Sequence, residues 1–320
     1  MSEYHVPVLL KESVDALITD PSGTYVDATY GGGGHSAEIL SRLSPEGRLI
    51  AFDRDSDAIA AGLDDPRLTL IHNDFRFVHN FALLEARRAA RDFRECDVDG
   101  ILADLGVSSH QFDTAGRGFS FRFDAPLDMR MNTRAELTAA DVVNTYPQEA
   151  LEQLFRLYGE IDNSRRLAAL VVAAREKEAI RTTGELDAAI KSALPPYAEH
   201  KYLAKVYQAL RIEVNQEMRS LGKFLDGAAK SLKPGGRLVV ITYHSLEDRM
   251  VKNFIRSGNV GGELEKDVFG RSGAPLRPLD RKPILPQESE IAANTRARSA
   301  KLRTAEKPLP AGTEERRKKK

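Results

Sequence analysis

Residues 25–36 read Tyr-Val-Asp-Ala-Thr-Tyr-Gly-Gly-Gly-Gly-His-Ser. An apolar run that ends in Asp27 is followed by a glycine loop and then by residues able to start a helix. Glycines let the backbone pass close to a ligand, and Ser36 can cap the helix. This order predicts the first strand, loop and helix of a nucleotide-binding α/β fold.

Further apolar runs resemble this first one. Each is short, bounded by turn residues and apolar throughout rather than alternating, which is typical of strands buried on both faces of a parallel sheet. Helix-forming segments such as Ser36–Leu43 and Ser56–Leu63 separate the first three, so we expect a doubly wound α/β sheet. The predicted strands are Thr24–Ala28, Arg48–Phe52, Leu68–Ile71, Gly100–Asp104 and Arg237–Thr242.

The spacing changes after the fourth predicted strand. A crossover needs about a dozen residues, whereas more than a hundred separate Asp104 from Arg237. Residues 137–193 are rich in Ala, Leu, Glu and Arg at helical spacing, and we expect a single long helix over residues 198–232. We therefore predict a discontinuous core (1–113 and 206–320, with a basic C-terminal arm) and, over 114–205, an active-site loop and an inserted helical substrate-binding domain.

Composition limits the class of protein. The chain has 320 residues, 42% of them hydrophobic, and lacks a run of about 18 apolar residues that could cross a membrane. Its N-terminus lacks the pattern of a secretion signal. Cys96 is the only cysteine, which excludes a disulfide framework and a cysteine-rich zinc site. We expect a cytoplasmic protein with no metal and no membrane partner.

A net charge of zero hides an asymmetry. Residues 271–320 hold 14 Lys or Arg and 6 Asp or Glu, a net of +8, so the remainder carries −8. A basic segment can follow a phosphate backbone. For residues 316–320 we favour a solubilising tail, and for the arginines near Arg296 both interpretations stay open.

A carboxylate stands where a ribose would need one. Asp53 ends the second predicted strand, 22 residues after Gly31, and is placed to accept both ribose hydroxyls. The alternative is a glycine turn with a helix-capping Asp. The G-x-G-x-x-G spacing of a nicotinamide dehydrogenase is absent, whereas the Pro234-Gly235-Gly236 turn resembles that of class I methyltransferases. Phe75, just past the third strand, is expected either to pack on adenine or to belong to the core.

Longer motifs make the resemblance specific. The chain resembles the bacterial 16S ribosomal RNA cytosine-N4 methyltransferases (the RsmH family, formerly MraW) in ordered blocks from Val8 to Arg303. They include residues 33–36, 53–55, 104–109 with 111, 117–121, 126–131, 208–212, 244–249 and 296–299.

The resemblance implies a class I (Rossmann-like) S-adenosylmethionine-dependent methyltransferase with an inserted helical domain. It implies methylation of one cytosine in the decoding region of 16S RNA, within the small ribosomal subunit. It is also compatible with a homodimer. Tyr30, Tyr207 and Tyr243 stand where the family has Phe, which we expect to change little, and Thr295 replaces Pro, which leaves the arm less rigid. The implied cofactor ligands are Gly33, Gly34, His35, Asp53, Phe75, Asp104 and Gln111.

Residue chemistry favours the N4 amine. Methylation at C5 needs a covalent nucleophile, normally a thiolate, and Cys96 precedes the fourth strand, at the edge opposite to the ligand edge. An amine needs only positioning and a hydrogen-bond acceptor. Asp104 is the candidate catalytic acceptor, although the Asp/Asn-Pro-Pro motif of many amino-methyltransferases is missing, and contact with the cofactor's methionine part is the competing role. His244 either takes a proton, contacts RNA or is structural.

The segment 108–131 has no clear helical or strand period, although it is long. Loops of this kind are usually functional, and its aromatic and arginine residues could hold a flipped base and phosphates. The alternative is a loop with its own small apolar core. A small-amine methyltransferase and a non-catalytic ribosome-binding factor are the competing functions. The expected RNA contacts are Arg117, Phe119, Arg130, Arg211, His244, Arg296 and Arg298.

Overall fold

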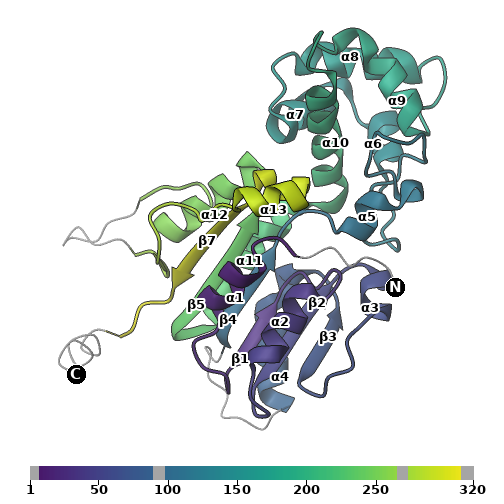
Figure 1. Cartoon of the computed structure of the whole chain (residues 1–320). Coiled ribbons are helices and arrows are strands. Elements are labelled where there is room, and N and C mark those ends of the chain that lie inside the picture. Colours follow the sequence, from purple (N-terminus) through teal and green to yellow (C-terminus); the bar gives the residue numbers. More distant parts are fainter. Residues whose placement is uncertain (1–6, 89–97, 265–272, 311–320) are drawn as a thin grey trace. The chain divides into compact units, whose positions relative to one another are not determined.

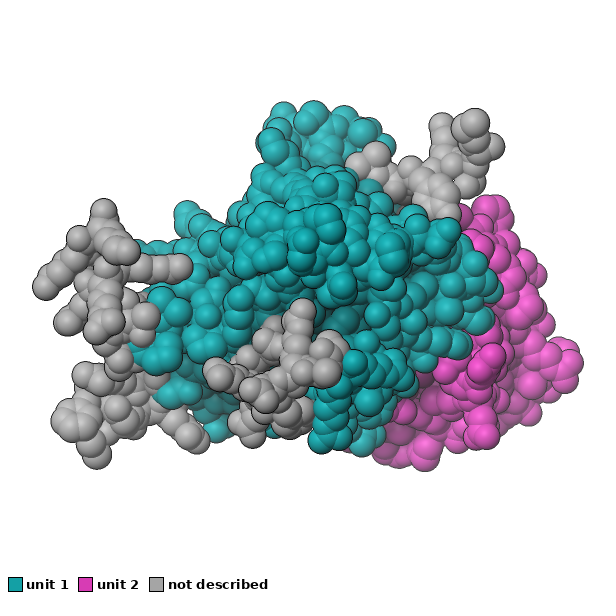
Figure 2. All heavy atoms as spheres, turned by 90° about the horizontal axis from the view of Figure 1, so that it is seen from below, with its two compact units in different colours: residues 1–106, 219–320 teal, residues 107–218 magenta. Residues whose placement is uncertain are grey.

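The computed structural model describes residues 7–88, 98–264 and 273–310. The chain divides into two compact units, one of residues 1–106 and 219–320 and the other of residues 107–218 (Figure 2). The boundaries predicted from the sequence, at 113/114 and 205/206, lie inside the second unit. No helix among the described residues is both long and apolar enough to cross a membrane.

A seven-stranded sheet with the order β3-β2-β1-β4-β5-β7-β6 forms the first unit (Figure 1). The first five strands pair in parallel, and the order reverses between β1 and β4, as in Rossmann-like folds. The predicted class I α/β fold is confirmed, and each predicted strand overlaps an observed one. The strands are β1 (Thr24–Asp27), β2 (Arg48–Asp53), β3 (Leu68–His72), β4 (Val98–Asp104), β5 (Leu232–Thr242), β6 (Arg277–Pro278) and β7 (Lys301–Glu306).

Helices cover both faces of this sheet. On one face, Val14 of α1 (Leu10–Leu17) and Ile39 of α2 (Gly34–Arg42) are fully buried in a core with side chains of β1, β2, β4 and β5. On the other, Phe52 meets Phe81 of α4 (Val78–Arg88) edge to face, and Val78 lies beside Gly227 of α11 (Glu217–Ser231). The other helices of the unit are α3 (Ser56–Ala60), α12 (Ser245–Ser257) and α13 (Glu288–Ala293).

The basic arm predicted at the C-terminus is, over residues 301–306, a strand of the sheet. Strand β7 pairs antiparallel with β5 along its whole length, and Leu302 and Ala305 are buried. A short strand that mixes charged with apolar residues carries a weak sequence signal, which is why the segment reads as an arm. Arg303 donates to the Asp248 carboxylate at 2.7 Å, so this arginine belongs to the fold.

Helices make up most of the second unit, and its core includes Leu151, Phe155, Leu167 and Leu210. Three of its helices begin with capping boxes, formed by Ser108 with Gln111, by Thr138 with Asp141 and by Thr182 with Glu185. Its α-helices are α5 (Ser109–Asp113), α6 (Ala139–Thr145), α7 (Gln148–Gly159), α8 (Ser164–Arg175), α9 (Thr183–Ile190) and α10 (Glu199–Asn215).

The single long helix predicted over residues 198–232 is wrong. Helix α10 ends at Asn215, and Gln216 has a left-handed backbone (φ 50°) before α11 begins. The Asn215 side chain accepts from Met131 N at 2.8 Å and donates to Met129 O at 2.8 Å. These long-range hydrogen bonds hold the chain at the position where the helix stops, and helical periodicity does not reveal them.

Candidate active site

Three carboxylates gather at the carboxyl edge of the sheet. The last residue of β1 is Asp27, that of β2 is Asp53 and that of β4 is Asp104, and these three strands are adjacent and parallel. In the register, Asp27 is level with Ala51 of β2 and Leu102 of β4. Ligands of open α/β sheets bind at this edge, next to the point where the strand order reverses.

The glycine loop connects β1 to α2. Gly31 and Gly33 have positive φ values of 52° and 77°, which favour glycine. A Cβ on Gly33 would lie 2.6 Å from the Tyr30 hydroxyl oxygen, and one on Gly34 would lie 2.2 Å from Pro7. The loop therefore has no room for side chains at these two positions.

The predicted capping role of Ser36 is wrong. Gly33 is the N-cap of α2 and no side chain caps this helix, whereas Ser36 Oγ donates to Asp27 Oδ2 at 2.7 Å. Helix α2 therefore begins with backbone N–H groups that carry the positive end of its dipole and are suited to an anion.

Asp27 was not predicted as a site residue. Its carboxylate is fully buried and also accepts from Thr29 N at 3.1 Å. Burial raises its pKa, against the hydrogen bonds from Ser36 and Thr29. A charged residue closing an otherwise apolar strand was the available sequence signal. Asp27 fixes both ends of the glycine loop rather than facing outward.

Asp53 shapes the loop as well. Its Oδ2 accepts from Gly31 N at 2.7 Å and its Oδ1 from Asp55 N at 2.8 Å. Burial raises its pKa, and the two backbone hydrogen bonds oppose this. Each carboxylate oxygen can accept a second hydrogen bond, so the geometry is compatible with the predicted pair of hydroxyls. The side chain that caps α3 is that of Asp55, and not that of Asp53.

Asp104 lies at the centre of a polar cluster. Its backbone N donates to Thr29 Oγ1 at 2.7 Å, and its Oδ1 accepts from the Tyr243 hydroxyl at 2.8 Å. Its Oδ2 is 3.8 Å from His35 Nδ1. Burial raises the pKa of Asp104 to about 6, with His35 and Tyr243 opposing and Asp27 adding to the rise.

His35 and Phe75 complete the site in this unit. His35 is 5% exposed, and burial lowers its pKa although Asp104 opposes this, so its imidazole is neutral at pH 7. Phe75 contacts Phe224 edge to face at 5.2 Å between ring centroids, with Arg54 at 5.7 Å from its centroid. Phe75 is half-buried, which leaves part of its ring for a ligand.

Comparisons with known proteins identify the family of the chain. The model of the MraW methylase family matches residues 2–308. The chain belongs to the MraW methylase family. It is 59% identical to the ribosomal RNA small subunit methyltransferase H of Bacteroides fragilis (strain YCH46), over 95% of this chain and 97% of that protein. The protein of that name from Flavobacterium johnsoniae is 53% identical, over 95% and 98%. NSun6 from Pyrococcus horikoshii aligns with a TM-score of 0.42 at 14% identity, over 96% and 56%.

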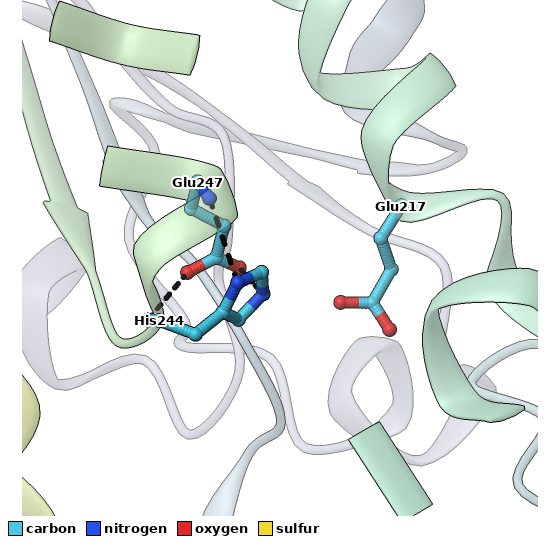
Figure 3. A group of neighbouring side chains, drawn as sticks. All are labelled: Glu217, His244 and Glu247. Atoms are coloured by element: carbon cyan, nitrogen blue, oxygen red, sulfur yellow. Dashed lines mark hydrogen bonds and ion pairs between the residues drawn. The ribbon is translucent and has the colours of Figure 1, made fainter. Parts of the chain in front are cut away.

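In this MraW methylase, His244 caps a helix. Its Nδ1 lies 3.5 Å from Glu247 N (Figure 3). The Glu247 carboxylate also accepts from Tyr243 N at 2.9 Å. His244 Nε2 also lies 3.1 Å from Glu247 Oε1, although without the geometry of a hydrogen bond. These contacts favour the structural role for His244, and its contact with RNA stays a prediction.

Arg211 and Gln111 lie in the second unit of the methylase. Arg211 donates twice to the Glu217 carboxylate, at 2.8 and 3.0 Å. Gln111 is buried and forms a capping box with Ser108 at the start of α5. The predicted contacts of Arg211 with RNA and of Gln111 with the cofactor are untested.

The segment 108–131 folds around apolar side chains. Phe119 is 6% exposed and belongs to the core of the second unit, so in this conformation it cannot stack on a base as predicted. Arg117 donates to the carbonyl oxygens of Arg130 and Met131, and Arg130 pairs with Asp128 at 2.7 Å. The apolar side chains of the segment thus pack into the core of the second unit and not into a small core of their own.

The remaining predicted residues lie near the C-terminus. Arg296 and Arg298 are in a 3-10 helix (Thr295–Ser299), the first half-buried and the second exposed. Cys96 and residues 316–320 lie outside the described residues. All three tyrosine hydroxyls form hydrogen bonds that Phe could not: Tyr30 accepts from Leu63 N, Tyr207 donates to Asp187 and Tyr243 donates to Asp104. That the tyrosines change little stays a prediction.

Proposed function

We propose that this chain transfers a methyl group from S-adenosylmethionine to the exocyclic N4 amine of a cytosine in the decoding region of small-subunit ribosomal RNA. The proposal rests on one observation at the carboxyl edge of the sheet. There Asp53 and Asp104 both contact the segment that contains the glycine loop, and their carboxylates can still accept hydrogen bonds from a ligand. The names of the relatives support ribosomal RNA as the substrate.

The residues at this edge fit the polar groups of S-adenosylmethionine, which supplies an electrophilic methyl group when bound. Asp53 would accept hydrogen bonds from the two ribose hydroxyls, and the N–H groups at the start of α2 would face the carboxylate. The ring of Phe75 would pack on the adenine. Oδ2 of Asp104 would accept a hydrogen bond from the ammonium group of the cofactor or from the target amine. Gly33, Gly34, His35 and Gln111 complete the proposed set.

The N4 amine is proposed over C5 because methylation at C5 depends on a thiolate. The one cysteine of the sequence, Cys96, precedes β4, whereas the site follows the carboxyl end of that strand. An amine loses resonance with its ring as it attacks, and a fixed acceptor stabilises this change without a covalent step. We propose the second unit and the exposed Arg298 as RNA-binding elements. A homodimer stays a prediction.

The test is incubation of the chain with labelled S-adenosylmethionine and one of three acceptors: small subunits lacking the modification, naked 16S RNA, or free nucleosides. We expect label in the RNA, recovered as N4-methylcytidine after digestion to nucleosides. Label recovered as 5-methylcytidine, or only in free nucleosides, would replace the proposal by C5 chemistry or by a small-amine methyltransferase. Binding to subunits without transfer would indicate a non-catalytic factor.

A further inference from the structure

Tyr243 is held rigidly beside Asp104. It directly follows β5, and its backbone N donates to Glu247 Oε2 at 2.9 Å. Gly106 adopts a φ of 102°, and a Cβ there would lie 3.4 Å from the Tyr243 ring, so the ring packs closely against the backbone after β4. The phenol therefore has little freedom to leave Asp104.

The hydroxyl of Tyr243 makes the two oxygens of Asp104 unequal. Oδ1 accepts its proton at 2.8 Å, whereas no hydrogen bond reaches Oδ2 from the residues that the structure describes, and His35 Nδ1 is 3.8 Å away. The Asp104 side chain is 22% exposed, so Oδ2 is the oxygen left for a donor that arrives from outside.

Charged groups around this pair come from several elements. Asp27 on β1 and Glu247 on α12 disfavour ionised Asp104, while His35 on α2 favours it only when its imidazole is protonated. Burial raises the pKa of the Tyr243 phenol well above 10, and Asp104, Glu247 and Glu290 of α13 add to this. The phenol therefore stays protonated at neutral pH and can only donate to Asp104.

We propose that Tyr243 is a positioning residue: its hydroxyl fixes the Asp104 carboxylate, favours its ionised form, and leaves Oδ2 to accept the N–H of a cationic or amine group. The inference rests on the proposed function for the identity of that group, but the coupling between Tyr243 and Asp104 can be measured without it. Because the hydrogen bond favours the ionised carboxylate, its removal should raise the pKa of Asp104.

The test is Tyr243→Phe, which removes the hydroxyl alone. With carboxyl-¹³C aspartate in the unliganded protein, the Asp104 resonance, assigned by its loss in Asp104→Asn, should titrate at a higher pH than in the wild type. The acidic limb of the single-turnover methylation rate should move in the same direction, with a loss of about tenfold below the midpoint and a smaller loss at pH 8.5. Tyr25→Phe is the matched control, because among the described residues that buried hydroxyl forms hydrogen bonds only with the backbone of residues 19 and 20.

An Asp104 titration that is unchanged in folded Tyr243→Phe would overturn the inference. So would an equal rate loss at every pH accompanied by the melting-temperature drop of the Tyr25→Phe control, since that pattern indicates structure alone. In the Asp104→Asn background, Tyr243→Phe should leave the pH profile unmoved, and a shift there would also contradict it. If the wild type transfers no methyl group, the proposed function fails, while the ¹³C titration still decides the role of Tyr243.

Discussion

The Asp104→Asn substitution removes a buried negative charge and keeps the size of the side chain. Asn can still accept the Tyr243 hydroxyl proton through its carbonyl oxygen. In the wild type, burial raises the pKa of Asp104 from 3.8 to about 6. The raised pKa means that ionised Asp104 opposes folding, so the substitution should stabilise the unliganded chain at neutral pH.

The magnitude follows from linkage between ionisation and folding. A pKa raised from 3.8 to about 6 corresponds to roughly 3 kcal/mol of folding free energy lost on ionisation. Because the Asp104 side chain is 22% exposed, solvent screens part of this, and we expect about 1–2 kcal/mol. The stabilising effect of protonation is fully present below pH 3.8 and is lost as the pH rises through about 6. The advantage of the variant should therefore be small below pH 3.8, about half developed at pH 5 and fully developed at pH 8.

Urea unfolding of the first unit, followed by circular dichroism without cofactor at pH 5, 6.5 and 8, measures this difference. Asp248→Asn is the matched control in the same unit. Asp248 is partly buried, yet Arg303 and Lys301 hold its pKa below 3.8, so its neutralisation should destabilise the chain at pH 8. An Asp104→Asn variant less stable than the wild type at pH 8, or equally more stable at all three pH values, would refute the reasoning.

The same variant separates the two roles of Asp104. If Oδ2 binds the cofactor ammonium, affinity for S-adenosylmethionine should fall by about 1.5–3 kcal/mol, and saturation should largely restore the single-turnover rate. If Oδ2 accepts from the target amine, affinity should hold and the rate should fall by about 10²–10³-fold. We expect the first result. A variant with unchanged affinity and unchanged rate would remove Asp104 from the site.

Three further substitutions test other parts of the molecule. Asp53→Asn keeps one acceptor oxygen for Gly31 N or Asp55 N but loses the charge, and calorimetry should detect cofactor binding weakened by about 1.5–3 kcal/mol; wild-type affinity would end the ribose assignment. Arg298→Ala should lower RNA affinity and reduce its salt slope by about 1, and an unchanged slope would mean no phosphate contact. Arg303→Ala breaks the pair with Asp248, so thermal unfolding should move to lower temperature while the salt slope stays.

Local pattern was enough to predict the five parallel strands, the inserted helical segment and the carboxylates of Asp53 and Asp104. These depend on burial on both faces of a parallel sheet and on the rule that ligands bind at its carboxyl edge. Motifs of unusual composition also predicted the family, because residues 33–36 and 104–109 combine glycines and polar groups in a specific order.

Contacts between residues far apart in the chain decided the rest. Only the tertiary structure makes residues 301–306 a strand, since their pairing with β5 lies about sixty residues away in sequence. Likewise Gln216 breaks a periodic helix because Asn215 bonds to the backbone near Met131. Tyr243 reaches Asp104 across 139 residues, a contact that distinguishes its hydroxyl from the bare ring of Phe. Such contacts depend on where the folded chain brings each side chain, and the local sequence does not predict these positions.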